Sequence, residues 1–180
     1  MTLRLFAALI ILLSAVEGAS AKPPAPAIGI VDVDMILRDS TAAKSMRDQM
    51  EKHEATFRTE ITQQENALRQ ADQELAQKKA ILAPEAFNAQ VQDFQKRVAA
   101  LGELVQKRKK QLDDAFNGAQ KQLRDALGDV IQAQMKEQGL NMVVPRAVVF
   151  EMSKELDITQ ETLKRLNQKL PQVRVVLSTN

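Results

Sequence analysis

Two long stretches of the sequence place apolar residues at helical spacing. Between Ala42 and Pro84 mostly apolar side chains recur every three or four residues, and after Pro84 the same pattern continues to Gln138. The mean step of about 3.6 residues predicts two nearly straight amphipathic helices. At 1.5 Å per residue they would be roughly 60 Å and 80 Å long. Helices of this length cannot be buried in so short a chain, so we expect them to project from a smaller body.

Short runs of β-branched residues flank this helical region. Ile28–Asp34 precedes it, and Leu140–Val144 and Ala147–Phe150 follow it, which predicts three strands. None of them is stable alone, so we expect them to pair in one small sheet of about three strands. The chain must then return to its starting point. The pattern therefore predicts an antiparallel helical hairpin over residues 42–138, with its tip near Pro84.

The predicted fold class is α+β and mostly α, a long coiled-coil-like arm on a small β-sheet body. Gly139 is placed to end the second helix in a left-handed turn, and a last amphipathic helix is expected over 160–169. The expected organisation is a signal peptide at 1–21, a proline-rich leader at 22–27, a β-rich oligomerisation body at 28–41 and 139–170, the arm at 42–138, and a C-terminal tail or additional edge strand at 171–180.

The first residues have the features of a secretory signal. Arg4 precedes an apolar run from Leu5 to Leu13, and Ala19-Ser20-Ala21 is a small-x-small cleavage pattern. The alternative is a membrane anchor, but the run is shorter than the roughly 20 residues needed to span a membrane. We expect cleavage after Ala21 and a mature chain outside the cytoplasm.

Composition excludes most catalytic chemistry. The chain has no Cys, Trp or Tyr and one His, so no thiol nucleophile or zinc–thiolate site can form. Asp32 and Asp34 superficially resemble paired carboxylates, but we interpret them as the end of a strand. His53 lies in the apolar stripe and is interpreted as a packed side chain. We expect no enzyme activity, no metal and no cofactor.

The predicted body is too small for a comfortable core of its own. Self-association would cover its open sheet edges, so we infer a homo-oligomer. The residues expected to form this oligomerisation body are apolar positions of the three predicted strands: Ile28, Ile30, Val31, Val143, Val144, Val148 and Val149.

In the order and spacing of these features the chain resembles the Skp/OmpH family of periplasmic chaperones of Gram-negative bacteria. The resemblance covers nearly all of the mature chain. It depends on the signal peptide, on Ile28–Asp34, on the Gln-, Lys-, Glu- and Ala-rich arms, on Gly139–Val144, and on Asp157-Ile158-Thr159 before the last helix. It implies a jellyfish-like homotrimer with a β-barrel-like body. It also implies an ATP-independent periplasmic holdase that encloses unfolded outer-membrane proteins between its arms.

A container for many clients needs weak and adaptable apolar contacts. The arms offer six residues of this kind as candidate client-binding residues: Met46, Met50, Phe57, Phe87, Phe94 and Phe116. The alternative is that these side chains only hold the two helices together.

One basic run stands out against a formal net charge of only +2. It consists of Lys107, Arg108, Lys109 and Lys110. A solvated helix face is the interpretation we favour, and attraction of acidic unfolded chains, lipopolysaccharide or other anionic lipid is the alternative. Specific nucleic-acid binding is not expected. Two other function classes stay open: a structural or adaptor coiled coil of the cell envelope, and a protein that binds through charge alone.

Overall fold

The computed structural model describes residues 25–178, so the predicted signal peptide and the first part of the leader lie outside the described residues. Within these residues the chain is mostly helical and carries one two-stranded sheet, in agreement with the predicted mostly α, α+β class. In chain order the elements are β1 (Ile28–Val31), α1 (Val33–Asp39), α2 (Thr41–Lys78), α3 (Pro84–Gln138), β2 (Met142–Pro145), the 3₁₀ turns η1 (Arg146–Val148) and η2 (Lys154–Leu156), and α4 (Thr159–Lys169).

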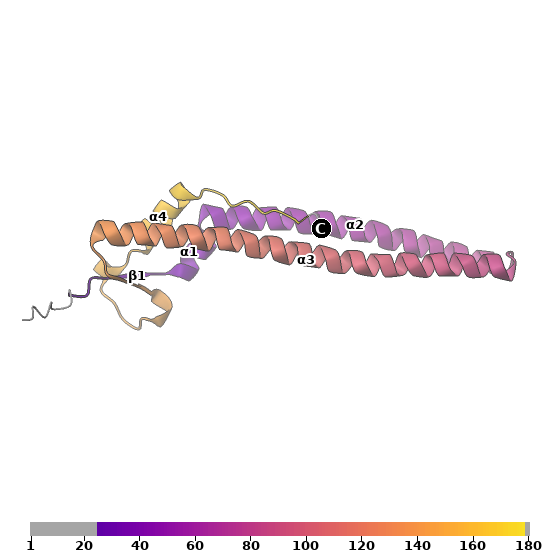
Figure 1. The fold of residues 1–180 in the computed structure, drawn as a ribbon, viewed down its shortest axis with the longest axis horizontal. Coiled ribbons are helices and arrows are strands. Elements are labelled where there is room, and N and C mark those ends of the chain that lie inside the picture. Colours follow the sequence, from indigo (N-terminus) through magenta and orange to yellow (C-terminus); the bar gives the residue numbers. More distant parts are fainter. Residues whose placement is uncertain (1–24, 179–180) are drawn as a thin grey trace, which may run out of the picture.

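The two long helices, α2 and α3, form an arm that extends from the body (Figure 1). They have 38 and 55 residues, and they lie side by side with opposite chain directions. The chain turns between Lys79 and Ala83. Pro84 is the first residue of α3, where its missing N–H costs nothing because the first turn of a helix has no intrahelical acceptor. Ala83 before it is extended, as the residue preceding a proline prefers.

The sheet pairs the two ends of the chain in parallel. Ile28 is opposite Met142, and the register continues to Val31 opposite Pro145. The prediction of a third strand at Ala147–Phe150 was wrong, because η1 begins directly after Pro145. Proline has no N–H to continue a ladder. In place of a third strand, residue 157 forms an isolated bridge with Ile30, and the Ile158 N–H donates to the Ile30 carbonyl at 2.9 Å.

A short helix, α1, stands where the sequence predicted the end of the first strand. Asp32 caps it: its carboxylate accepts a hydrogen bond from the Met35 N–H at 2.8 Å. Asp34 lies in the first turn, where negative charge suits the helix dipole. The two carboxylates are therefore explained by helix capping. Ser40 then separates α1 from α2 and caps the second helix through the Ala43 N–H at 3.2 Å.

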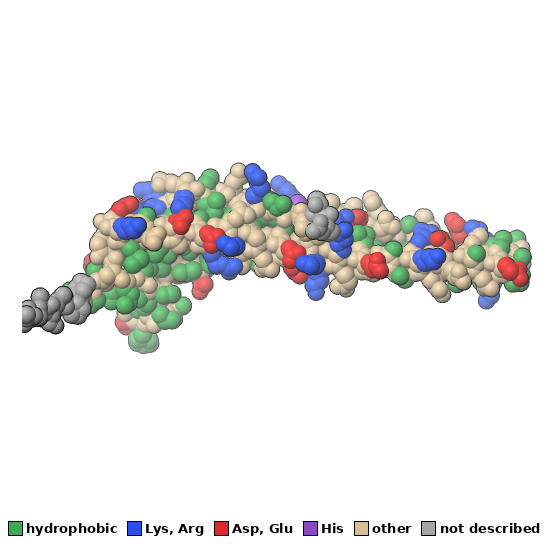
Figure 2. All heavy atoms as spheres, viewed as in Figure 1, with side chains coloured by type: hydrophobic (Ala, Val, Ile, Leu, Met, Phe, Trp, Pro, Cys, Tyr) green, Lys and Arg blue, Asp and Glu red, His purple; other side chains and the backbone are tan. Residues whose placement is uncertain are grey.

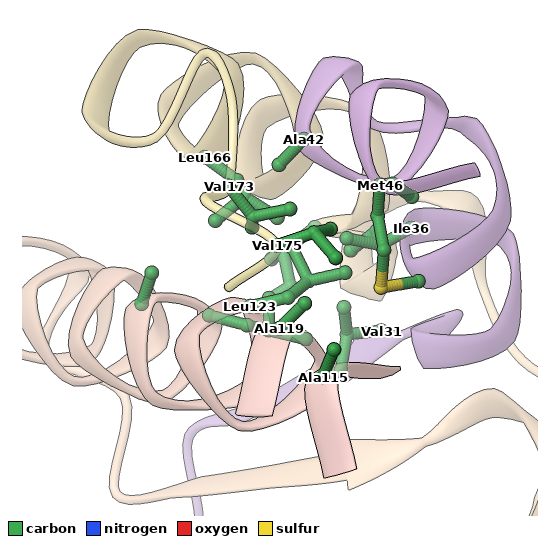
Figure 3. Packing of buried hydrophobic residues seen from close by; sticks show 14 residues of the cluster. Val31, Ile36, Ala42, Met46, Ala115, Ala119, Leu123, Leu166, Val173 and Val175 are labelled. Carbon is green, nitrogen blue, oxygen red and sulfur yellow. The ribbon is translucent and has the colours of Figure 1, made fainter. Parts of the chain in front are cut away.

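The core lies where the base of the arm meets the body. Figure 3 shows side chains from β1, α1, α2, α3, α4 and the C-terminal segment converging on one cluster. Its largest fully buried members are Ile36, Leu123 and Leu166, at 0%, 1% and 0% exposure. In α2 the buried residues end at Phe57, and in α3 they begin at Gln111. The outer part of the arm therefore has no enclosed core.

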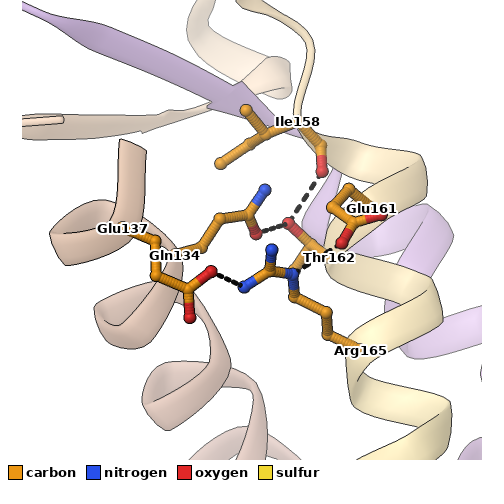
Figure 4. Close-up of polar contacts among 6 residues, drawn as sticks. All are labelled: Gln134, Glu137, Ile158, Glu161, Thr162 and Arg165. Atoms are coloured by element: carbon orange, nitrogen blue, oxygen red, sulfur yellow. Dashed lines mark hydrogen bonds and ion pairs between the residues drawn. The ribbon is translucent and has the colours of Figure 1, made fainter. Parts of the chain in front are cut away.

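The end of α3 packs against α4, so the longer helix is anchored on the body. Gly139 ends α3 with φ = 67°, the predicted left-handed turn that glycine adopts readily. Arg165 of α4 donates to Glu137 at 2.5 Å and to Glu161 at 2.7 Å (Figure 4). Lys169 pairs with Asp129 at 2.8 Å.

A buried glutamine sits within this helix contact. Gln134 and Thr162 are both 0% exposed, and the Thr162 hydroxyl lies 2.8 Å from Gln134 Oε1 and 2.8 Å from the Ile158 carbonyl (Figure 4). A hydroxyl has one proton and can donate to only one of them. Within the described residues Gln134 Nε2 has no hydrogen-bond partner. The amide therefore adds little net stability.

Replacement of this amide by an apolar group of similar size should be tolerated. We expect Gln134→Leu to keep the free energy of unfolding within about 1 kcal/mol of the parent, because the Thr162 hydroxyl keeps its hydrogen bond to the Ile158 carbonyl. Gln134→Ala should cost about 2 kcal/mol or more, because it leaves a cavity. Urea unfolding followed by circular dichroism measures both. Equal losses in the two variants would show that the amide itself is required.

Candidate functional site

The structure divides the six candidate apolar residues of the arm into three groups. Met46 and Phe57 are buried, at 6% and 7% exposure, and hold the helices together. Met50, Phe87 and Phe94 are half-buried. Phe116 is exposed at 37%. Only the last four present any surface to a partner of the described chain.

One contact between the two arm helices joins Arg108 of α3 to Glu60 and Phe57 of α2. We call these three residues the clamp. Arg108 binds the Glu60 carboxylate with two hydrogen bonds of 2.9 and 2.8 Å and lies 4.6 Å from the centroid of the Phe57 ring. It also donates to Gln111 at 2.9 Å. A planar guanidinium can satisfy all these contacts at once, which an ammonium cannot. The hydrogen bonds from Arg108 hold the pKa of Glu60 below its ordinary value of 4.5.

This clamp splits the basic run. Arg108 faces the partner helix, and Lys110 pairs with Asp114 at 2.6 Å one turn along α3. Among the described residues, Lys107 and Lys109 are exposed and take part in no ion pair. Lys109 also lines an open hollow of about 430 Å³ between the helices, together with Phe57 and Arg108. Two of the four cations thus remain for an external partner.

The residues predicted for the oligomerisation body also differ in how exposed they are. Ile30 and Val31 are buried within the subunit, at 4% and 1% exposure. The other strand residues, Ile28, Val143 and Val144, are half-buried, as is Val149. Val148 is exposed at 74%.

An exposed apolar patch lies on the body near β2. It consists of Met142, Val148, Phe150 and Leu156, and Phe150 alone is 94% exposed. Figure 2 shows apolar side chains gathered at the body end, whereas the arm carries charges of both signs along its length. We call these four residues the body patch. The sequence pattern did not single out Phe150 or Met142 because hydropathy alone does not distinguish an enclosed strand residue from one on an open turn.

The C-terminal residues were predicted to be a tail or an additional edge strand, and the described ones lie against the arm without joining the sheet. Residues 171–178, which we call the strap, are extended and run along the arm from the end of α4 (Figure 1). Gln49 of α2 and Gln122 of α3 bind the strap backbone. Val173 and Val175 point into the core cluster, where they are 3% and 7% exposed (Figure 3). The alternation of Val173, Val175 and Leu177 is the only sequence signal for this arrangement.

Two further properties limit what the described residues can do. Within residues 25–178, no cluster of three or more His, Cys, Asp or Glu side chains is arranged to hold a metal ion. None of the described helices combines the length and hydropathy that a membrane crossing requires.

Fold and surface together define a class of protein: a small parallel sheet bearing a long two-helix arm, with an uncovered apolar patch on the body. The family described as outer membrane protein (OmpH-like) matches residues 27–166, and the chain belongs to this family.

Comparison with solved structures identifies the same fold. The chain is similar to a crystal structure from Caulobacter crescentus CB15 described as an OmpH-like outer membrane chaperone. The two share 19% sequence identity at a TM-score of 0.80, over 88% of this chain and 94% of that chain. No curated protein sequence matches the chain.

The clamp predicts a pH-dependent contribution to stability. Because the folded pKa of Glu60 lies below its ordinary value, its contribution is present at neutral pH and is lost as the pH falls through the folded pKa. We expect Glu60→Gln to lower the free energy of unfolding at neutral pH by no more than about 1 kcal/mol, since both side chains are partly exposed. The difference from the parent should shrink at an acidic pH below the ordinary Glu pKa of 4.5.

Urea unfolding at the two pH values measures this difference. Glu103→Gln is the matched control, because Glu103 is an exposed carboxylate on α3 without an ion pair among the described residues. A Glu60→Gln loss that persists unchanged in acid would contradict the charge-based account of the clamp.

Proposed function

We propose that this chain is an ATP-independent holdase of the periplasm that encloses unfolded outer-membrane proteins between the arms of a homotrimer. The observation that carries the proposal is the shape of the subunit. An arm whose α3 helix is about 80 Å long by its rise per residue stands on a body that leaves an apolar patch uncovered. Membership of the OmpH-like family and the chaperone description of the Caulobacter structure support it.

The arms suit weak capture. Their outer part, from residue 58 to residue 110, contains no buried residue, and half-buried side chains such as Phe87 and Phe94 alternate there with charged and amide groups. Ile81 at the tip is 80% exposed. Scattered apolar contacts in a polar surface bind many unfolded sequences loosely and none tightly. Met50, Phe87, Phe94 and Phe116 are the candidate client contacts that remain, and Lys107 and Lys109 are the candidate contacts to lipopolysaccharide or other anionic lipid.

The holdase activity can be tested directly. We expect the mature protein to suppress light scattering from a urea-unfolded outer-membrane β-barrel that is diluted into buffer. About one trimer per client should suffice, without ATP. Addition of ATP should change nothing, and moderate salt should reduce the effect only partly, because binding driven by charge alone falls steeply with salt. Undiminished aggregation at a several-fold excess of protein would leave the envelope spacer or adaptor as the better interpretation.

Oligomerisation is proposed to occur through the body patch. A two-stranded sheet is marginal alone, and large exposed apolar side chains on a soluble surface indicate a contact. We expect a Val148→Asp/Phe150→Asp variant to elute as a monomer, measured by size-exclusion chromatography with light scattering, while the parent elutes as a trimer. The helical signal in circular dichroism should remain.

The matched control is Val98→Asp on α3, because Val98 is 46% exposed but lies far along the arm. This variant should keep the parent mass. A double variant that stays trimeric would place the subunit interface elsewhere on the body.

A further inference from the structure

Three glutamine side chains bind the strap backbone: Gln111 Nε2 donates to the Ser178 carbonyl at 2.5 Å, and Gln49 and Gln122 bind the strap in the way neighbouring strands bind a strand. Gln49 Nε2 donates to the Val173 carbonyl at 2.8 Å, and the Val175 N–H donates to Gln49 Oε1 at 3.2 Å. On the other edge, Gln122 Nε2 donates to the Arg174 carbonyl at 3.0 Å, and the Arg174 N–H donates to Gln122 Oε1 at 3.3 Å. In extended backbone the polar groups of consecutive residues point to opposite edges. Gln49 therefore satisfies backbone polar groups on one edge of the strap, and Gln122 satisfies those on the other edge.

The side chains of the strap alternate as in a half-buried strand. Val173 and Val175 are enclosed in the core cluster, and Leu177 packs against it. Arg174 is exposed between them, and Val176 is 62% exposed. An open hollow of about 560 Å³ lies beside this segment, lined in part by Gln49 and Gln122. The enclosed face is thus filled by every second residue, with a period of two.

These contacts do not depend on one particular sequence. The glutamines bind main-chain atoms that every residue except proline carries, and the cluster accepts aliphatic side chains at alternate positions. Within the described residues the Arg174 side chain forms no hydrogen bond or ion pair. The contacts fit an extended conformation with alternate apolar residues, which is also the pattern of a transmembrane β-strand.

We infer that the strap occupies a binding site for extended segments of unfolded polypeptide with alternating apolar side chains, and that it is the site's intramolecular occupant. The site comprises Gln49, Gln122 and the apolar cluster beneath Val173 and Val175; we call it the strap site. The inference rests on the proposed holdase function and names the part of a client that the base of the arm would bind. Because a departing strap uncovers the cluster, only a segment with the same alternation can replace it without exposing apolar surface.

The strap also sets the strength of capture. A segment tethered to its own site acts at an effective concentration in the millimolar range, so an incoming segment must compete with it. The apparent affinity for a client is reduced by the fraction of sites that the strap fills. An unfolded β-barrel presents many segments of the required pattern. A client can therefore still bind, even though each of its segments competes only weakly with the strap.

A cleavable tether tests this without altering either glutamine. Beyond Arg174, two residues of extended chain advance about 6.6 Å, and the helical turn from Gln122 back to Gly118 advances about 6 Å. Val176 and Gly118 are therefore at the same level of the arm, and both are exposed, with nothing within 4 Å of a Cβ at Gly118. The chain has no cysteine of its own. A Gly118→Cys/Val176→Cys variant can be joined by a reductant-cleavable bismaleimide.

The probe is a fluorescent synthetic peptide with the sequence of residues 171–180, and its binding is followed by anisotropy. We expect at least tenfold weaker binding to the tethered protein than to the same protein after reductive cleavage. A peptide of different sequence with alternating valines should behave alike. Methylation of the two amide nitrogens that correspond to Arg174 and Val175 should abolish binding, because the glutamine oxygens then receive no proton.

Equal affinity of the tethered and cleaved forms, or no binding to either, would overturn the strap site. Undiminished binding of the methylated peptide would overturn the role of Gln49 and Gln122 as backbone acceptors. Suppression of β-barrel aggregation by the unmodified parent is measured in parallel. If the parent suppresses aggregation but the tether has no effect on peptide binding, the holdase proposal stands and the strap site fails; if the parent does not suppress it, the peptide data still decide the strap site.

Discussion

The parallel pairing of β1 with β2 is the contact on which the arrangement of the subunit depends. Parallel strands cannot be joined by a tight turn and need a crossover connection, usually a helix. Here the crossover is the whole arm, because α2 leaves the body after β1 and α3 returns to it before β2. Gly29 lies at the centre of this contact, and a Cβ there would come within 2.9 Å of the Leu140 side chain and 3.0 Å of Ile158. The close packing of Leu140 and Ile158 against Gly29 thus fixes the positions of both ends of the arm.

Elements with strong local signals could be predicted from the sequence. Both long helices, the left-handed turn at Gly139 and the last helix follow from periodicity and from helix-end residues. Two errors came from competing local chemistry. The first strand was predicted to continue to Asp34, but Asp32 caps a helix that begins at Val33. Pro145 ends β2 before Ala147–Phe150 can join the sheet.

The candidate site was harder to predict because its residues act through tertiary context. Arg108 belongs both to a run of four cations and to a helical stripe, and only the position of Glu60 on the other helix decides that it faces inward. Gln49 and Gln122 are ordinary surface residues by hydropathy. Their role appears only when the strap brings its backbone between them. Met46 shows the same limit, since a helical stripe does not reveal how far along the arm the enclosed core extends.

That limit has a consequence for how the subunit moves. Burial in the arm is confined to its base, as Phe57 is the last buried residue of α2 and Gln111 the first of α3. Backbone amides toward the tip are protected only by helix hydrogen bonds and half-covered side chains, so their opening requires little free energy compared with global unfolding. Amide hydrogen exchange should therefore form a gradient, fast near residue 81 and slow near the sheet. The outer ends of α2 and α3 can unfold locally and re-form while the base of the arm remains folded.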